Sequence, residues 1–224
     1  MANFLNILGA NIKGAGTDEI IVEGVDELSG GRFSIPFDRI EAGTYLAAAV
    51  ATNGNIKINK IDSSRMGNMI EKFQLMGAFI ELNENTVHIQ MEKNIGPVDV
   101  ITEPFPGFPT DMQAQFTLIN SIANGSATVT EKIFENRFMH VQELVRMGCD
   151  ITVNGNSALI NGVKKIYGAQ VMATDLRASA CLILAGLCAE GETIVDRVYH
   201  IDRGYERIEE KLSYLGANIE RLPR

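Results

Sequence analysis

Cysteine, histidine and long apolar runs are all scarce in this sequence of 224 residues. The three cysteines include no Cys-x-x-Cys pair, which argues against a disulfide framework and against a structural zinc site. The three histidines are never four residues apart, so a histidine-rich metal site is not expected either. We therefore predict a protein that holds no metal ion and no cofactor.

Charge and hydropathy indicate where the protein is located and which classes of partner it lacks. The most apolar stretch, residues 178–189, is well short of the roughly 18–20 apolar residues of a membrane helix. The first residues lack the basic region and cleavage pattern of a signal peptide, so the sequence predicts a cytoplasmic location and no membrane partner. A net charge of −8 argues against a nucleic-acid partner, while 46% hydrophobic and 21% charged residues indicate a globular chain.

One pattern of helix, short β segment, second helix and strand occurs three times. Each second helix ends in a glycine, and these glycines, Gly77, Gly148 and Gly216, are roughly 70 residues apart. A glycine at that place suits a left-handed helix cap. The first helices cover residues 41–51, 111–119 and 175–185, and the second helices with their strands cover residues 69–80, 141–151 and 208–219.

Residues 3–12 match the end of a fourth copy of this pattern. They read as a second helix, its glycine and its strand, and a strand pair is predicted at residues 11–13 and 19–25. On this pattern we expect the chain to begin inside a larger repeat array; the alternative is a short natural protein that starts with a helix.

Helix pairs with short mixed strands, repeated three times, predict an α/β (α+β) fold in which sheets surround buried helices. The helices that contain residues 47–50 and 178–187 are apolar on nearly every face, as interior helices are. The β segments alternate apolar and polar residues, for example at 56–61 and 87–91.

Three helix starts carry a residue able to cap them. Asp38 and Thr110 each stand three residues before an acidic or amide side chain, Glu41 and Gln113, which is the capping-box spacing. Thr174 directly precedes the first helix of the third copy and is predicted to cap it.

The cysteines are interpreted as structural. Cys149 occupies the place that Ala78 and Ala217 hold in the other copies, and Cys181 and Cys188 are seven residues apart on one face of an apolar helix. A buried thiol in apolar surroundings has a raised pKa and is inert.

Asp111 is the first candidate for chemistry. A proline-rich stretch, residues 104–109, leads directly to it at the start of a helix. The helix dipole favours a carboxylate there, which suits a general base or a group that binds a hydroxyl. The alternative is an acidic residue that only stabilises the helix start.

Arginines at helix starts are the second group of candidates. Asp175 and Arg177 stand two residues apart and could bind each other or a substrate, or form only a polar pair at the helix start. Arg137 and Arg203 precede second helices, where the dipole opposes a cation, so an anion is expected nearby. Arg65 stands similarly in the first copy, and for all three the alternative is a surface arginine paired with a neighbouring acid.

Four segments together carry a family resemblance. The chain resembles the UDP-N-acetylglucosamine enolpyruvyl transferase family (UDP-N-acetylglucosamine 1-carboxyvinyltransferase), and the match covers essentially the whole chain. The segments are Phe-Pro-Thr-Asp-Met-Gln-Ala-Gln-Phe at 108–116, Phe-Glu-Asn-Arg-Phe-Met-His at 134–140, residues 168–180 around Ala-Thr-Asp-Leu-Arg-Ala, and residues 191–209 with Ile-Asp-Arg-Gly-Tyr-Glu-Arg.

The resemblance implies an inside-out α/β barrel of the enolpyruvyl transferase type, with three helix/sheet repeats around buried helices. Family members have two such domains, with the active site between them, and are about twice as long. This chain resembles their C-terminal half. Residues 1–35 then correspond to the tail of the domain that carries the catalytic loop, and residues 36–224 to the other domain without its N-terminal segment.

The resemblance also implies an activity and a set of roles. The family transfers enolpyruvyl from phosphoenolpyruvate to the 3′-hydroxyl of UDP-N-acetylglucosamine, the first committed step of peptidoglycan synthesis, and releases phosphate. Asp111 is expected to bind and deprotonate this hydroxyl, and Asp175 to support proton transfer at the reacting carbon. Substrate contacts are expected from Ile133, Phe134, Arg137, Arg177 and Arg203, the three arginines facing the phosphoenolpyruvate anion and Arg203 also acting in catalysis.

The sequence departs from the family in one large respect. The glycine-rich loop with the reactive cysteine is absent, as are the N-terminal Lys-Asn pair and the other domain's arginines, so we expect no useful turnover from this chain without the missing N-terminal half. The alternative is a non-catalytic domain that binds a UDP-sugar or regulates a full-length enzyme. The sister family that makes 5-enolpyruvylshikimate 3-phosphate fits segments 108–116 and 134–140 less well. An exposed half-cleft also predicts self-association.

Overall fold

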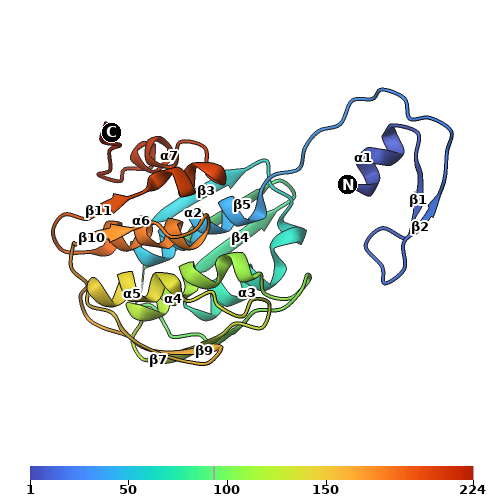
Figure 1. The fold of residues 1–224 in the computed structure, drawn as a ribbon. Helices are drawn as coiled ribbons and strands as arrows, with labels where there is room; N and C mark the ends of the chain where they lie inside the picture. Colours follow the sequence, from blue (N-terminus) through green and yellow to red (C-terminus); the bar gives the residue numbers. More distant parts are fainter. Residues whose placement is uncertain (93, 224) are drawn as a thin grey trace. The chain divides into compact units, whose positions relative to one another are not determined.

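The computed structural model describes residues 1–92 and 94–223. The chain divides into two compact units, Met1–Pro36 and Phe37–Arg224. Figure 1 shows the chain as a ribbon coloured along the sequence. Each unit is described separately.

The first unit is small. Helix α1 (Ala2–Ile7) is followed by β1 (Asn11–Lys13) and β2 (Ile21–Glu23), which pair antiparallel. The strand pair predicted at residues 11–13 and 19–25 is therefore found, with a second strand shorter than expected. Every residue of α1 is exposed or half-buried, so this unit has little core of its own.

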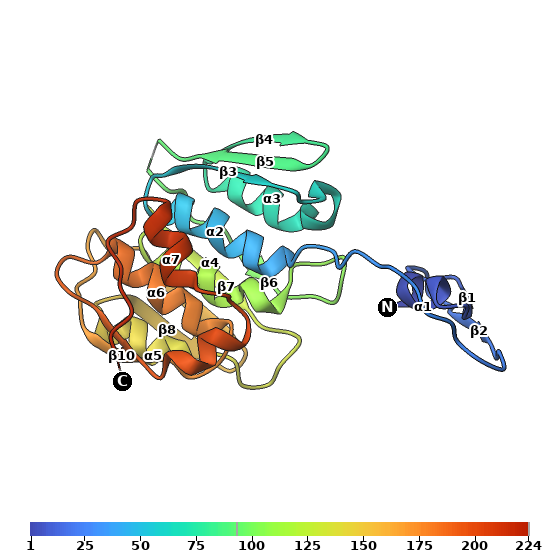
Figure 2. The ribbon, with the colours of Figure 1, turned by 90° about the horizontal axis from the view of Figure 1, so that it is seen from above.

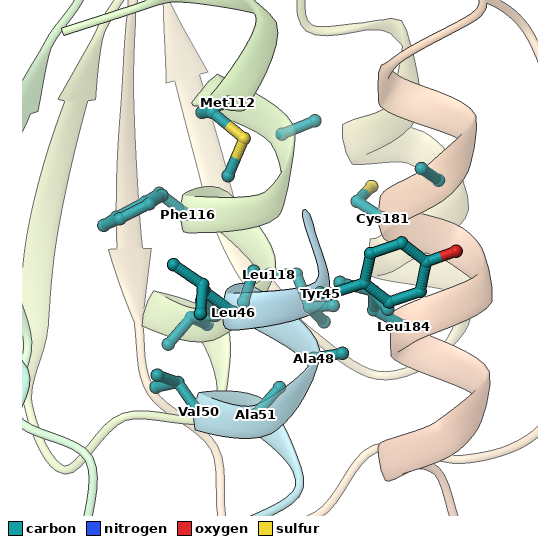
Figure 3. Close-up of a cluster of buried hydrophobic side chains, with 14 of the residues drawn as sticks. Tyr45, Leu46, Ala48, Val50, Ala51, Met112, Phe116, Leu118, Cys181 and Leu184 are labelled. Atoms are coloured by element: carbon teal, nitrogen blue, oxygen red, sulfur yellow. The ribbon is translucent and has the colours of Figure 1, made fainter. Parts of the chain in front are cut away.

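Three helices form the centre of the second unit. They are α2 (Arg39–Ala51), α4 (Gln113–Ser121) and α6 (Ala178–Cys188), one from each repeat, and they pack against one another. Figure 3 shows their apolar side chains meeting, among them Leu46 and Phe116. All of α4 and most of α2 and α6 are buried, which confirms the prediction of interior helices. None of the helices in the described part of the chain could cross a membrane.

Each of the first two repeats contains one sheet, in which most neighbouring strands pair antiparallel. The first repeat has the order β3-β5-β4, with strands Asn55–Asn59, Thr86–Gln90 and Phe79–Asn83. The second has the order β6-β7-β9-β8, with strands Val100–Ile101, Ser126–Thr130, Ser157–Asn161 and Asp150–Asn154. Figure 2 shows the first sheet along one side of the unit, with α2 and α3 (Gly67–Leu75) on its inner face. The predicted α/β fold of helix/sheet repeats around buried helices is thus confirmed.

The remaining elements include three 3-10 helices and two short α-helices. The first repeat contains the 3-10 helix η1 (Ser63–Met66) before α3, and the second contains η2 (Thr110–Met112) before α4 and α5 (Met139–Arg146) after β7. The third contains η3 (Val198–Arg203) before α7 (Ile208–Tyr214).

The third repeat has less sheet than the sequence predicts. Its strands β10 (Gln170–Met172) and β11 (Ile194–Asp196) pair parallel. The strand expected after α7, at residues 217–219, is wrong, because residues 215–223 contain no strand. Arg221 in this segment instead forms ion pairs with Asp202 and Glu209. Side chains, and not the backbone hydrogen bonds of a sheet, therefore hold the segment in place.

The glycines that mark the repeats share one conformation. Gly9, Gly77, Gly148 and Gly216 each follow a helix with φ between +99° and +103°. A side chain is strained at such a φ, so glycine is required there. This confirms the predicted helix ends and shows that the second helix of every copy stops in the same way.

Candidate functional site

Asp111 and Arg137 form the centre of a polar cluster in the second repeat. The proline-rich stretch ends at Pro109, so Asp111 lies in η2, directly before α4. Arg137 lies in the loop between β7 and α5 and donates from Nη2 to Asp111 Oδ1 at 2.6 Å and from Nη1 to Thr110 Oγ1 at 2.6 Å. The Arg137 side chain is only 18% exposed, whereas that of Asp111 is 39% exposed.

A second arginine reaches the same carboxylate from the third repeat. Arg177 Nε lies 3.9 Å from Asp111 Oδ2, and Arg177 Nη2 donates to Asp38 Oδ2 at 2.8 Å. Burial works against the charge of Arg177, but Asp38 and the hydroxyl of Tyr205 outweigh it and raise the pKa of Arg177. Burial likewise opposes ionisation of Asp38, yet Arg177 and the backbone N–H of Ile40 lower the pKa of Asp38 below its ordinary value. The cluster therefore joins all three repeats.

The caps at these helix starts differ from the sequence prediction in two of three cases. Asp38 does cap α2, since its Oδ1 accepts from the N–H groups of residues 40 and 41. Thr110 does not cap its helix, because its hydroxyl is engaged by Glu131 and Arg137. The prediction for Thr174 is also wrong: Asp175 Oδ1 accepts the N–H groups of residues 177 and 178 at 2.8 Å and caps the helix start instead.

The other predicted site residues lie at different distances from this centre. The ring of Phe134 lies under the Arg137 guanidinium, 4.7 Å from its centroid, and the N–H groups of Ile133 and Phe134 donate to Glu131. Arg203 is exposed in η3 and makes no ion pair with any residue of the described chain. Its neighbour Gly204 accepts a hydrogen bond from Arg177 Nη1, which places Arg203 one residue from the cluster.

Arg65 has different surroundings from the other arginines. It pairs with Asp62, three residues before it, and both side chains are about half exposed at 52% and 49%. The alternative of a surface arginine paired with a neighbouring acid therefore applies to Arg65. It does not apply to Arg137, whose partners are 26 and 27 residues away.

Two residues of the cluster were not singled out from the sequence. Glu131 is 2% exposed and accepts four hydrogen bonds. A signal for it exists, since Ala127, Val129 and Glu131 share one face of an alternating strand and the first two are buried. Tyr205 is 1% exposed, with its ring 5.1 Å from the Arg177 guanidinium, and no pattern in the sequence marks it.

His140 is buried beside the cluster. Burial lowers its pKa to about 4, against a raising effect of Asp175 and with a further lowering by Arg137. The imidazole is therefore neutral at neutral pH, and neither of its ring nitrogens has a hydrogen-bond partner among the described residues. His140 is therefore close enough to Asp175 and Arg137 for both to influence its pKa, without carrying a charge of its own.

The cysteines are inert, as predicted. Burial raises the pKa of Cys149 to about 11 and that of Cys188 to about 12, and it raises that of Cys181 well above the ordinary value. At neutral pH none of the three is a thiolate.

Residues 1–212 match the family model described as EPSP synthase (3-phosphoshikimate 1-carboxyvinyltransferase). The chain belongs to the EPSP synthase family. Within this family it is similar to the UDP-N-acetylglucosamine 1-carboxyvinyltransferase of Coxiella burnetii strain Dugway 5J108-111, with 57% identity over 99% of this chain and 51% of that protein. The corresponding protein of Aeromonas hydrophila is 55% identical over 99% of this chain and 53% of its own length.

Solved structures of other proteins have the same fold. The enolpyruvyl transferase NikO from Streptomyces tendae matches with a TM-score of 0.85 and 28% identity, over 98% of this chain and 53% of that one. The EPSP synthase from Acinetobacter baumannii matches with a TM-score of 0.76 at 17% identity, over 99% of this chain and 55% of that one, which shows the fold alone. The chain spans about half the length of the curated relatives it matches.

Proposed function

We propose that this chain provides one side of an active site that transfers enolpyruvyl from phosphoenolpyruvate to the 3′-hydroxyl of UDP-N-acetylglucosamine, with release of phosphate. In that role it would serve the first committed step of peptidoglycan synthesis. The observation that carries the proposal is the joining of Asp111, Arg137 and Arg177 from two repeats. The identity to UDP-N-acetylglucosamine 1-carboxyvinyltransferases supports the choice of acceptor.

The geometry of Asp111 suits the hydroxyl of an acceptor sugar. Its Oδ1 accepts from Arg137, while its Oδ2 has no hydrogen bond from any described residue and lies 3.9 Å from Arg177 Nε. A 39% exposed carboxylate with one oxygen fixed and the other open can accept the hydroxyl proton. We therefore assign Asp111 to binding the 3′-hydroxyl and taking its proton as the new carbon–oxygen bond forms.

The arginines suit the anionic donor. Phosphoenolpyruvate carries a carboxylate and a phosphate, and a planar guanidinium group can bind either of them through two parallel hydrogen bonds. Arg177 Nε is a donor without a hydrogen-bond partner in the described chain, and Arg203 is exposed one residue from the cluster. We assign these two, with Arg137, to the donor anion and to the charge that develops on it, and Arg203 also to catalysis.

The remaining roles follow from position. We assign the loop that contains Ile133 and Phe134 to the UDP-sugar side, because this loop carries Arg137 to Asp111. Asp175 caps the start of the third-repeat helix with one oxygen, Oδ1, and we assign its carboxylate to proton transfer at the reacting carbon. We assign residues 36–224 to one transferase domain and residues 1–35 to the tail of the other.

Phosphate release tests the proposal. It is measured with both substrates, with each one omitted, and with shikimate 3-phosphate in place of the UDP-sugar. Because the chain spans half the length of its relatives, it is assayed alone and mixed with the part of the Coxiella burnetii enzyme outside the match. We expect release only in the mixture, and only with phosphoenolpyruvate and UDP-N-acetylglucosamine together.

Asp111→Asn and Asp62→Asn form a matched pair of variants for this assay. The first removes the proposed base, and the second removes only the charge of an exposed capping residue in the first repeat. We expect Asp111→Asn to slow release by roughly 100-fold or more and Asp62→Asn to leave it unchanged. If the mixture releases no phosphate yet the chain binds UDP-N-acetylglucosamine in calorimetry, a sugar-binding or regulatory domain is the better assignment.

A further inference from the structure

Glu131 is a buried carboxylate at the end of β7 whose every hydrogen bond is made within the second repeat. Its Oε1 accepts from Thr102 Oγ1 at 2.7 Å and from the N–H groups of Ile133 and Phe134 at 2.8 and 3.1 Å. Its Oε2 accepts from Thr110 Oγ1 at 2.8 Å. A charge this deeply buried is tolerated only with such a full set of donors.

The direction of the hydrogen bonds between Glu131 and Arg137 is fixed by chemistry. A guanidinium can only donate and a carboxylate can only accept. Thr110 lies between them, so its hydroxyl must accept from Arg137 Nη1 and donate to Glu131 Oε2. The chain of contacts Glu131–Thr110–Arg137–Asp111 therefore has a single arrangement of protons.

We propose that Glu131 is the positioning residue that sets Arg137 against Asp111. It acts by two routes: it orients the Thr110 hydroxyl that binds Arg137, and it holds the backbone of Phe134, whose ring lies under the guanidinium. Its importance for catalysis rests on the proposed function. Its effect on the position of Arg137 does not, and is measured separately.

Replacing Glu131 with glutamine is expected to weaken the route through Thr110 more than the route through the backbone of Phe134. If the nitrogen of a glutamine replaced Oε1, it would face three donors, which is unfavourable. If it replaced Oε2, it would donate to Thr110, whose own proton would then lose its acceptor. Glu131→Gln is therefore expected to keep the loop and to loosen the link to Thr110 and Arg137.

The experiment compares Glu131→Gln, Thr110→Val, Thr110→Ser, the double variant of the first two, and Thr130→Val. The last is a control, since it removes the hydroxyl that pairs with Ser157 one residue from Glu131 and outside the cluster. Two quantities are measured in each. One is the NMR spectrum of the Arg137 guanidinium N–H groups, assigned by Arg137→Lys. The other is phosphate release by the mixture described above.

We expect Glu131→Gln and Thr110→Val to shift and broaden the Arg137 signals and to lower the turnover number roughly tenfold or more, with little change in KM for the UDP-sugar. Thr110→Ser should restore both quantities and Thr130→Val should alter neither. Because the two residues act in series, the double variant should lose no more than the worse single variant.

Two results would overturn the proposal. In one, Glu131→Gln folds and its Arg137 signals match those of Thr130→Val. In the other, the losses of turnover in the two single variants add fully in the double variant. If Glu131→Gln does not fold, Thr110→Val and its serine rescue decide the question, because they leave the bonds of Glu131 to the loop intact. If the unmodified mixture releases no phosphate, the proposed function fails while the NMR comparison still tests the positioning.

Discussion

Three arginines stand near the start of the second helix in the three repeats, yet the chain gives each different surroundings. Arg65 is half-exposed, and its side chain binds Asp62, three residues before it, and no other described residue. Arg137 is 18% exposed and binds Asp111 from across the repeat. Arg203 is exposed and forms no ion pair within the described residues. Equivalent positions in the three repeats thus hold an exposed ion pair, a half-buried ion pair and an arginine without an ion pair among the described residues.

The different surroundings of the three arginines indicate what distinguishes a functional site from the repeated fold that carries it. All three repeats have the glycine-terminated second helix, with Gly77, Gly148 and Gly216 in one conformation. In the described residues Arg65 pairs locally with Asp62, whereas Arg137 and Arg177 meet carboxylates from distant parts of the chain. Long-range pairing under partial burial, and not the presence of an arginine, is the feature that points to chemistry.

Replacing Arg137 should have the largest effect on activity. Arg137→Ala removes the donors to Asp111 and Thr110, so we expect phosphate release by the mixture to fall about 100- to 1,000-fold. Arg137→Lys should not restore it, because a single ammonium cannot bind both oxygens in the same geometry. Steady-state assays check this, with Arg65→Ala as the control. A loss shared equally by Arg65→Ala would break the comparison.

His140 should make the second repeat sensitive to acid. Its folded pKa of about 4 lies below the ordinary 6.5, so between these values the unfolded chain binds more protons than the folded one. Stability should therefore fall as the pH decreases from 6.5 to 4, by about 3 kcal/mol at most. Urea unfolding across this range should show a much smaller decline for His140→Leu.

His200 in the third repeat provides the control for this experiment. It lies in η3, and His200→Gln should keep the acid sensitivity of the unmodified chain. If His140→Leu and the unmodified chain lose the same stability on acidification, the sensitivity belongs to other groups and the special burial of His140 is not its cause.

Some of these structural features follow from the sequence alone, and others do not. The buried helices and the glycine ends follow from apolar composition and spacing, which are local properties. The bond of Arg137 to Thr110 does not, because it depends on a loop and the 3-10 helix η2, 27 residues apart, meeting in space. Thr110 was expected to cap its helix because the capping-box spacing is local, and the long-range partner prevailed.

Glu131 and Tyr205 show the two ways in which site residues escape notice. Glu131 lies on the inward face of an alternating strand, so its burial was predictable from the period of two, although its four donors were not. Tyr205 lies between η3 and α7, outside any element whose period could predict its burial, and its contact with Arg177 arises from tertiary packing.

Asp38 should have a smaller but measurable effect on stability. It caps α2 and pairs with Arg177 of another repeat, so Asp38→Ala should lower the free energy of unfolding by about 1–2 kcal/mol at pH 7. Asp38→Asn keeps a capping oxygen and should cost less. Because the folded pKa lies below 3.8, this stabilisation is present above pH 3.8 and is lost as the pH falls through the folded value.

The corresponding pair in the first repeat sharpens this prediction. Asp62 also caps a helix start and also pairs with an arginine, but both partners are exposed and close in sequence. In chemical denaturation at pH 7, Asp62→Asn should lower the free energy of unfolding less than Asp38→Asn does. Equal effects would mean that pairing between repeats adds nothing to the cap.

Arg65→Ala should have the smallest effect of all. The one side-chain hydrogen bond of Arg65 to a described residue runs from Nε to Asp62 Oδ2 at the exposed surface. There solvent screens the charges, and the cost of ordering the side chains offsets the attraction. Asp62 keeps its bonds from the N–H and hydroxyl of Ser64 after the change, so no buried group loses a partner. The unfolding midpoint in urea and the rate of phosphate release should both match those of the unmodified chain. A clear drop in either would mean that the first-repeat arginine also belongs to the site, and that exposure and local pairing do not separate framework from function in this fold.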